Sequence, residues 1–581
     1  MRKPIRILWA LLAVSLSLPA VALAQGVADQ IDALVSRYHE LGQFNGSVLV
    51  AQNGEVIYEK GFGYANMEWS IPNAPDTKFR IGSVTKQFTA VMILKLVEAG
   101  EVSLDGKITD YLPDYPAETG DQVTIHHLLT HTSGIPSYTG LSGFMREHSR
   151  DPYTPAELVA VFASLDLEFE PGSDWRYNNS GYFLLGRIIE EVTGMPYDEA
   201  LREMVLDPLG LDATGYDHFS DVLPGRAAGY SQAFHGYENA DYLDTSLPYA
   251  AGSMYSTVRD LFEWDRILYT DRVFDSSGTK ETMFTPFLNN YAYGWGVRDL
   301  EVGDSTTKLI SHGGGINGFI TGFWRLVDDE HTIIVMDNTA GNRVGAISRG
   351  IANILYGEEP AAPTQSIAQV VYDAIAADGL DAAVARYWEL EETDPDGYVF
   401  AEQELNRLGY YYLGNGSVQT AIDVFKLNVE AYPEGANAYD SLGEGYMVAG
   451  YDNLAIAAYQ KSLELDHEND NAREMLKRMG VDLSAAPVPD EIELPVEILQ
   501  RYVGRYEFQG GLAITVRLED GRLMAQVEGD VAVEMHPLSD TRFRLPDAES
   551  EVEFTLGEEG RVTGFTMYQT GAEIRGNRKG S

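Results

Sequence analysis

Three short segments of the chain place a lysine three residues after a serine, a spacing that can supply a nucleophile and its base. The pairs are Ser83 and Lys86 in RIGSVTKQFTAVM, Ser277 and Lys280 in SGTK, and Ser305 and Lys308 in STTK. A serine hydroxyl is a weak nucleophile until a base takes its proton, and lysine acts as that base only where its pKa is lowered. The surroundings of each pair therefore decide which one could be catalytic.

Only Ser83 and Lys86 begin a sustained helical pattern, which runs through apolar residues to Gly100. The predicted helix is apolar on nearly all sides, so we expect it to be buried in a domain core. Residues three apart in a helix share a face, so the hydroxyl and the amine would meet in a low dielectric. Backbone N–H groups at the helix N-terminus could also stabilise an oxyanion. The alternative is a helix cap beside a surface lysine.

The other two pairs have less favourable surroundings. The SGTK segment contains Gly278 and lies near Pro286, so it is predicted to be a loop. The STTK segment is predicted to be a turn that enters a strand, where Ser305 and Lys308 would point to opposite faces.

Two further motifs could complete a site. Tyr-x-Asn occurs at Tyr64/Asn66, Tyr177/Asn179 and Tyr237/Asn239. Only the copy at Tyr177 and Asn179 lies in a polar bend, PGSDWRYNNSG, that enters an apolar helical segment. His-x-Gly occurs once, at His312 to Gly314 in SHGGGINGF, and its glycines let backbone approach a ligand closely.

A metal site is not predicted. His126, His127 and His131 lie together in the helix-like TIHHLLTHTSG, but no nearby carboxylate completes a set of ligands. The chain contains no cysteine, which excludes disulfides, thiolate nucleophiles and zinc sites built from cysteine. We expect neither a metal nor an organic cofactor.

The composition is that of a globular protein of several domains. The chain has 581 residues, of which 44% are hydrophobic and 22% charged. Its net charge of −46 argues against nucleic acid or an anionic membrane surface as a partner, because both require clustered lysine and arginine.

Residues 1–24 have the layout of a secretory signal peptide: a basic start, an apolar stretch and a small-residue end at Ala24. The alternative is a membrane anchor, but the apolar stretch is shorter than the ~20 residues that a spanning helix needs. We therefore predict a periplasmic or secreted protein with no membrane span after cleavage and no lipid-bearing cysteine.

Residues 25–357 are predicted to form one α/β domain. A hairpin is expected at 45–65 around Asn53-Gly54, helices dominate 80–200, and strand-like segments return at 290–338. Strands at both ends predict a sheet that distant segments complete. A linker rich in proline, alanine and acidic residues follows at 358–365.

Residues 366–482 are predicted to form helical repeats. The segments 402–435 and 436–469 match with a period of 34 residues and carry the small and aromatic positions of a tetratricopeptide repeat. The segment 379–390 is expected to belong to a degenerate first repeat. A proline-rich linker at 483–496 precedes a small all-β module at 497–581, with a hairpin turn at Asp520-Gly521.

With these motifs in order, the chain resembles the serine β-lactamase and penicillin-binding-protein superfamily. Its order is Ser83-x-x-Lys86, then Tyr177-x-Asn179, then His312-x-Gly314. The resemblance is to the class C β-lactamase-like branch, which includes DD-peptidases, D-aminopeptidases and esterases, and it covers about residues 28–355. It implies an antiparallel sheet flanked by helices with a helical subdomain. The C-terminal module resembles the lipocalin-like domains appended to such proteins.

The resemblance also implies a role for each motif residue. Ser83 would be acylated, and Lys86 would be the base or share a proton with Tyr177. Tyr177 would protonate the leaving group and activate water, and Asn179 would bind the substrate amide. Backbone N–H groups of Ser83 and Gly315, next to Gly314, would form the oxyanion hole.

One position departs from many β-lactamases, because His312 stands where they have a lysine. His-x-Gly is found in peptidases and related hydrolases. The resemblance therefore favours an exported serine hydrolase of an ester, a peptide or an amide, including substrates with D-residues. A class C-type β-lactamase is a second hypothesis. A third is a scaffold protein whose repeats bind a protein partner and whose hydrolase domain is inert or sensory.

Overall fold

The computed structural model describes most of the chain. The described residues are 18–341, 343–481, 494–508, 513–519, 521–527, 532–539, 541–545, 550–557, 561–569 and 572–579. The chain divides into two compact units, Met1–Gln365 and Ser366–Ser581. Residues 1–17 of the predicted signal peptide lie outside the described part, so its cleavage stays a prediction. No helix in the described part has the length and apolar character needed to cross a membrane.

The first unit is built on a six-stranded antiparallel sheet in the order β10-β11-β12-β13-β1-β2. The strands are β1 (Gly46–Gln52), β2 (Glu55–Gly61), β10 (Gly296–Val302), β11 (Ser305–Ile316), β12 (Phe319–Leu326) and β13 (His331–Asp337). The N-terminal hairpin joins the C-terminal strands because β1 pairs with β13, with Val48 opposite Val335. The expectation of a sheet completed by distant segments is confirmed.

The hairpin turn is the predicted Asn53-Gly54. Both residues have positive φ, 52° and 80°, as a two-residue turn of the primed type requires. The Asn53 amide also donates to Nδ1 of His331 at 3.1 Å, which ties the turn to β13.

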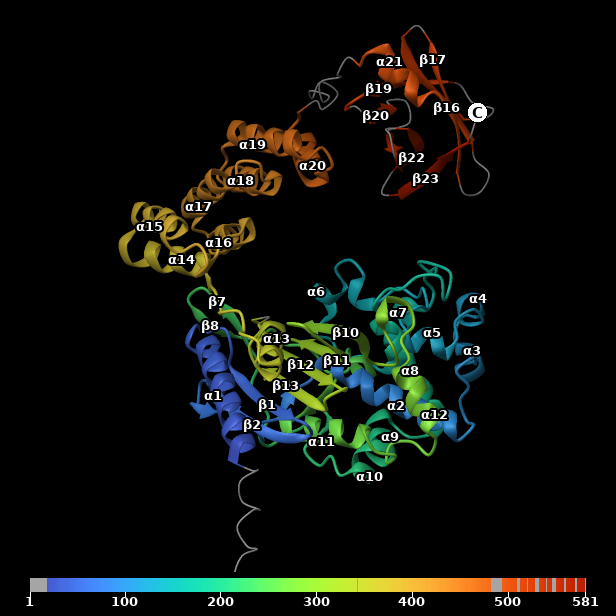
Figure 1. Ribbon diagram of the computed structural model, residues 1–581, viewed down its shortest axis with the longest axis vertical. Coiled ribbons are helices and arrows are strands. Elements are labelled where there is room, and N and C mark those ends of the chain that lie inside the picture. Colours follow the sequence, from blue (N-terminus) through green and yellow to red (C-terminus); the bar gives the residue numbers. More distant parts are fainter. Residues whose placement is uncertain are drawn as a thin grey trace, which may run out of the picture. The chain divides into compact units, whose positions relative to one another are not determined.

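The sheet is buried on both faces, and alternate residues of its central strands belong to different cores. Val48 and Val335 pack in one core, whereas Leu49 and Ile334 pack in the other. Helices α1 (Leu18–Glu40) and α13 (Val344–Leu355) contact each other, and α13 contacts β12 and β13. Figure 1 shows α13 lying against these strands. Helix α11 (Val258–Leu268) contacts β1 and β13 and joins the other core.

A helical region lies between the two groups of strands in the sequence. Besides α11, its α-helices are α2 (Thr85–Glu98), α3 (Ile108–Tyr111), α4 (Ala117–Gly120), α5 (Ile125–Leu129), α6 (Phe144–His148), α7 (Pro155–Phe162), α8 (Asn179–Thr193), α9 (Tyr197–Leu201), α10 (Asp207–Leu209) and α12 (Ser277–Phe284). Helix α2 is buried along nearly its whole length, as its apolar pattern predicts.

One expectation is wrong: the SGTK segment is helical. Ser277 and Lys280 lie in α12, because the Ser276 side chain accepts a hydrogen bond from the Gly278 amide and caps the helix despite its glycine. Lys280 Nζ donates to the Thr270 carbonyl at 2.7 Å. Ser305 and Lys308 of the STTK segment lie in a strand, as predicted, and β11 begins at Ser305.

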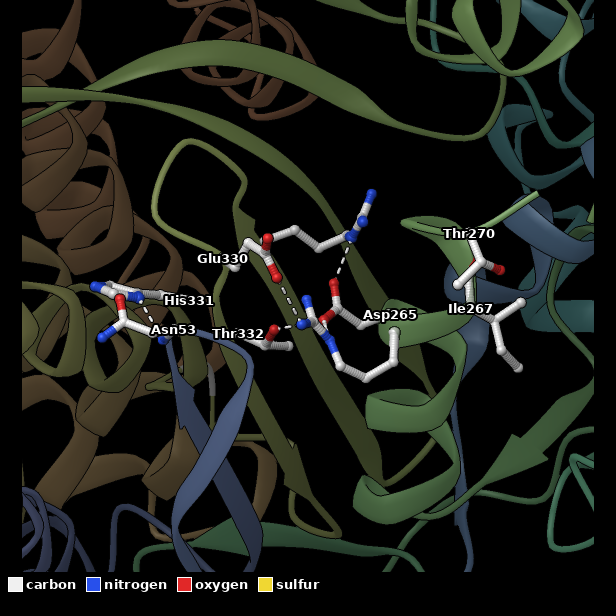
Figure 2. A network of polar contacts seen from close by, with 9 residues as sticks. Asn53, Asp265, Ile267, Thr270, Glu330, His331 and Thr332 are labelled. Carbon is white, nitrogen blue, oxygen red and sulfur yellow. Dashed lines mark hydrogen bonds and ion pairs between the residues drawn. The ribbon is translucent and has the colours of Figure 1, made fainter. Parts of the chain in front are cut away.

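A buried ion cluster fastens α11 to the sheet. Asp265 is fully buried and accepts from Arg325 Nε at 2.6 Å and from the Thr332 hydroxyl at 2.7 Å. Arg266 bridges Asp265, at 3.1 Å, and Glu330, at 2.9 Å. Figure 2 shows this network. The cluster therefore joins α11 to β12 through Arg325 and to β13 through Thr332.

The second unit begins with paired helices. They are α14 (Ile367–Asp378), α15 (Leu380–Thr393), α16 (Glu402–Gly414), α17 (Val418–Ala431), α18 (Ala436–Val448), α19 (Asp452–Leu465) and α20 (Asp470–Arg478). A Cβ at Gly409 would lie 2.2 Å from the Phe425 ring, and one at Gly443 would lie 3.0 Å from the Tyr459 ring. The same small-to-aromatic contact thus recurs in the pairs α16/α17 and α18/α19.

The chain ends in a closed eight-stranded barrel. Its strands are β16 (Gly504–Phe508), β17 (Ala513–Glu519), β18 (Arg522–Val527), β19 (Val533–Pro537), β20 (Arg542–Leu545), β21 (Ser550–Leu556), β22 (Val562–Gln569) and β23 (Ala572–Arg578). Pairing of β16 with β23 closes it, and aromatic side chains such as Phe543, Phe554 and Phe565 fill its core. Asp520, in the predicted turn between β17 and β18, lies outside the described residues.

Candidate active site

Ser83 lies in one turn of 3₁₀ helix, Gly82–Val84, directly before α2. The preceding strand β5 (Phe79–Arg80) pairs with β9 (Met254–Ser256), and the Ile81 amide donates to the Met254 carbonyl at 2.9 Å. Gly82 has φ of +51°, and a Cβ there would lie 2.8 Å from the Gly315 amide nitrogen. Only glycine suits this backbone, which brings Ser83 next to β11.

Lys86 is fully buried, and its amine contacts three oxygens. Nζ lies 3.1 Å from Ser83 Oγ, 2.9 Å from Asn179 Oδ1 and 2.8 Å from the Ala251 carbonyl. The structure therefore brings Ser83, Lys86 and Asn179 together. Ser83 does not cap α2, because no side chain caps that helix.

The three contacts suit both protonation states of Lys86. A charged amine donates to all three oxygens. A neutral amine donates to Asn179 and to the Ala251 carbonyl, neither of which can donate in return at those atoms, and its lone pair then accepts the Ser83 hydroxyl hydrogen. A proton can thus pass from Ser83 to Lys86 without movement of a heavy atom.

Burial favours the neutral form of both Lys86 and Tyr177. It lowers the pKa of the Lys86 amine well below its ordinary value. It also raises the pKa of the Tyr177 phenol, against a smaller opposing effect of the Ser83 hydroxyl. Lys86 Nζ lies 4.9 Å from the centre of the Tyr177 ring. The arrangement combines an amine that can accept a proton with a phenol that holds one.

The Tyr177 hydroxyl has no hydrogen-bond partner of good geometry among the described residues. The Ser83 hydroxyl is nevertheless close enough to lower the pKa of Tyr177 slightly. Tyr177 precedes α8, whose cap is the Asn178 side chain accepting from the Gly181 amide at 2.8 Å. Asn179, the first residue of α8, also donates from Nδ2 to the Thr139 hydroxyl at 3.0 Å. The bend that ends in this cap thus presents Tyr177 and Asn179 to Lys86.

His312 lies on β11, and its partners define its tautomer. Because a carbonyl only accepts, Nδ1 donates to the Gly313 carbonyl at 2.6 Å. Burial first, and then the charge of Lys86, lower the pKa of this half-buried imidazole to about 4. Nε2 of the neutral ring therefore accepts from the Tyr291 hydroxyl at 2.9 Å. At neutral pH His312 offers no positive charge.

Gly314 and Gly315 bring β11 against the Ser83 turn. A Cβ at Gly314 would lie 1.9 Å from the Ile81 carbonyl oxygen, so only glycine fits. Ser83 and Gly315 line the same cavity of about 160 Å³, together with Asn179. The Ser83 turn and the Gly315 backbone therefore border one space.

His131 is a site residue that the sequence motifs did not single out. It is 1% exposed, has φ of +62°, and its ring centre lies 4.3 Å from that of Tyr177. Its Nδ1 accepts from the Asn178 amide at 3.1 Å, so Nε2 carries the hydrogen and meets no partner among the described residues. In the sequence, His131 draws notice only as a candidate metal ligand beside His126 and His127. In the structure it supports the bend that contains Tyr177.

The neighbouring histidines each contact protein groups. His126 Nδ1 lies 2.8 Å from the Tyr293 hydroxyl, and His127 Nδ1 accepts from the Thr124 amide at 3.2 Å. In the part of the chain that the structure describes, no three histidine or acidic side chains are grouped as a metal site would require.

Comparison with known proteins matches residues 31–357 to the family described as Beta-lactamase and residues 488–578 to a domain of unknown function, DUF3471. A penicillin-binding protein of Bacillus subtilis (strain 168) is 27% identical over 94% of this chain and 98% of its own. Esterase EstB of Burkholderia gladioli is 35% identical over 33% of this chain and 52% of its own.

Among solved structures, the octameric penicillin-binding protein homologue from Pyrococcus abyssi aligns with 95% of this chain and 100% of its own, at a TM-score of 0.50 and 21% identity. This match concerns the fold. The family match covers more than half of the sequence and contains all three motifs. The chain therefore belongs to the Beta-lactamase family, the serine hydrolase superfamily that also includes the penicillin-binding proteins.

Proposed function

We propose that the protein hydrolyses an ester, a peptide or an amide through an acyl-enzyme on Ser83. The observation that carries this proposal is the fully buried Lys86 amine, 3.1 Å from Ser83 Oγ and without a carboxylate among its recorded partners. A lysine in that setting has the lowered pKa that a general base needs. The relatedness to a penicillin-binding protein and to an esterase supports the same reaction class.

The proposed cycle has two acyl transfers. Neutral Lys86 takes the Ser83 proton as Oγ bonds to the substrate carbonyl carbon, and the N–H groups of Ser83 and Gly315 hold the oxyanion. The bond to the leaving group then breaks, and the leaving group receives a proton from Tyr177, which Lys86 restores. Water attacks the acyl-enzyme, gives one proton to this pair, and releases the acid as Ser83 regains its hydrogen.

Active-site labelling tests the proposal without knowledge of the substrate. A fluorophosphonate probe should label the wild-type protein, and Ser83→Ala should abolish the label. Ser277→Ala and Ser305→Ala are matched controls, because they remove the serine of the same four-residue pattern elsewhere, and both should label normally. Equal labelling of wild type and Ser83→Ala would contradict the proposal.

We further propose that the protein is exported and that the helical segment binds a protein partner. The basic, apolar and small-residue layout of residues 1–24 supports export to the periplasm or beyond. The recurring contacts at Gly409 and Gly443 support tetratricopeptide-type repeats, which usually present a binding surface. N-terminal sequencing of the mature protein should begin at Gln25. Deletion of residues 366–482 should remove bound partners in a pull-down while Ser83 still labels.

A further inference from the structure

The cavity beside Ser83 has an apolar wall. Met145, Leu243, Leu247, Pro248 and Ile316 line it, and Leu243 and Leu247 are buried. Its volume of about 160 Å³ resembles that of apolar protein cavities of ~150 Å³ that hold a benzene molecule. A group of roughly that size can therefore enter and contact carbon on several sides.

The polar side chains of the cavity are neutral, and other protein groups engage them. Asn179 contacts Lys86 and Thr139, and Asn317 donates from Nδ2 to the Asp241 carbonyl at 3.0 Å. The Tyr138 hydroxyl donates to the Leu247 carbonyl at 2.7 Å. Within the described chain, no charged side chain lines this cavity.

Three arginines that are close in sequence to the site residues have carboxylate partners. These pairs are Arg80 with Asp217 at 2.6 Å, Arg150 with Asp241 at 3.4 Å, and Arg176 with Glu168 at 2.8 Å. His312 is neutral at pH 7, and the Lys86 amine is occupied by three oxygens. The net charge of −46 adds repulsion for any anion that approaches.

We infer that the substrate group bound beside Ser83 is uncharged and apolar, about the size of a phenyl ring or a short branched chain. The substrate is then a neutral ester or amide, not a peptide or lactam whose free carboxylate must sit in this cavity. A carboxylate there would lose part of its hydration and meet no charged side chain in the lining, which costs free energy. This inference rests on the proposed hydrolase function of Ser83.

Two esters of matched shape test the inference. Nitrophenyl 4-methylpentanoate ends in an isopropyl group, where the mono-nitrophenyl ester of succinic acid has a carboxylate of similar size. The full chain should hydrolyse the neutral ester with a kcat/KM at least ~100-fold higher. A ratio below about threefold, or one in favour of the charged ester, would overturn the inference. Nitrocefin, which carries a carboxylate, should not be turned over at a comparable rate.

A cation placed in the wall provides the reverse experiment. Met145→Lys adds a charge on α6 at a half-buried position, and Met145→Gln is the neutral control of similar length. The lysine variant should shift the ratio of the two esters toward the charged one by about tenfold or more relative to the glutamine variant. Ile316→Arg with Ile316→Gln repeats the test on β11. If neither cation shifts the ratio, the wall does not select by charge.

Ester hydrolysis by the Ser83→Ala variant separates failure of this inference from failure of the proposed function. If Ser83→Ala hydrolyses both esters as fast as wild type, the proposed nucleophile is wrong. If hydrolysis depends on Ser83 and still favours the succinate ester, the function stands and only the inference fails. Fluorophosphonate labelling also reports whether each variant retains a folded site.

Discussion

Replacement of Lys86 by arginine tests whether Lys86 acts as a base or only supplies a positive charge. Arginine stays protonated at all ordinary pH values, so Lys86→Arg keeps a positive charge near Ser83 but cannot accept its proton. The wild-type amine is placed to accept that proton, since it lies 3.1 Å from Ser83 Oγ and burial lowers its pKa. Loss of a positioned general base costs about 10²–10⁴-fold in rate.

The pH dependence sharpens this prediction. Below the pKa of Lys86, each decrease of one pH unit reduces the neutral fraction of the amine about tenfold, equivalent to about 1.4 kcal/mol. The rate of fluorophosphonate labelling of the wild type should therefore rise with pH until Lys86 is mostly neutral, and this rise should vanish in Lys86→Arg. His312 should not contribute above pH 6, because its pKa is about 4.

Labelling rates from pH 5 to pH 10, with folding checked by circular dichroism, provide the measurement. Lys280→Arg is the matched control, because Lys280 has the same spacing from a serine but donates to the Thr270 carbonyl at 2.7 Å. Its labelling should equal that of the wild type. If Lys86→Arg labels within about threefold of wild type, or keeps the same pH profile, Lys86 is not the base.

Three other variants probe the frame of the site. Asp265→Asn leaves the buried Arg325 guanidinium without its counter-charge and should lower the free energy of unfolding in urea by about 3–5 kcal/mol. The control Glu147→Gln removes one partner of an exposed ion pair and should change that free energy by less than about 1 kcal/mol. Equal effects of the two variants would contradict this prediction. Gly314→Ala should abolish labelling, because its Cβ would lie 1.9 Å from the Ile81 carbonyl oxygen. In Gly315→Ala the nearest atom to the new Cβ is 3.7 Å away, so this variant should remain folded by circular dichroism. A fully labelled Gly314→Ala would refute the packing argument. His131→Gln should slow labelling about tenfold or more by loosening the Tyr177 bend, and an unchanged rate would assign His131 no positioning role.

The sequence could predict the parts of this site that local pattern controls. The apolar run after Ser83 predicted a buried helix, and Asn53-Gly54 predicted the hairpin turn, because each depends on a few adjacent residues. The SGTK helix was missed for the same reason. Its glycine outweighed a cap, Ser276, whose effect requires backbone geometry that a list of residue types does not contain.

Contacts between distant segments could not be predicted. The Ala251 carbonyl that holds Lys86 lies 165 residues further along the chain and carries no side-chain signal. The hydroxyl that donates to Nε2 of His312 belongs to Tyr291, 21 residues earlier in the chain, and no motif marks that tyrosine. The left-handed backbone of His131 is equally invisible in sequence, because residues other than glycine seldom adopt it.

The burial of Lys86 also couples folding of the first unit to the release of a proton from this amine. An unfolded lysine binds a proton at neutral pH, whereas the folded amine has a lowered pKa. Between the folded and unfolded pKa values of this amine, Lys86 holds a proton in the unfolded chain and none in the folded one. Its contribution to the free energy of unfolding therefore rises with pH across that window, by up to about 1.4 kcal/mol per unit. Below the folded pKa both states are protonated and this slope disappears. The enthalpy of thermal unfolding, measured in buffers of different ionisation enthalpy, should therefore change with the buffer, because the buffer supplies the proton that Lys86 takes up. Calorimetry can thus detect the lowered pKa of Lys86 in the absence of any substrate.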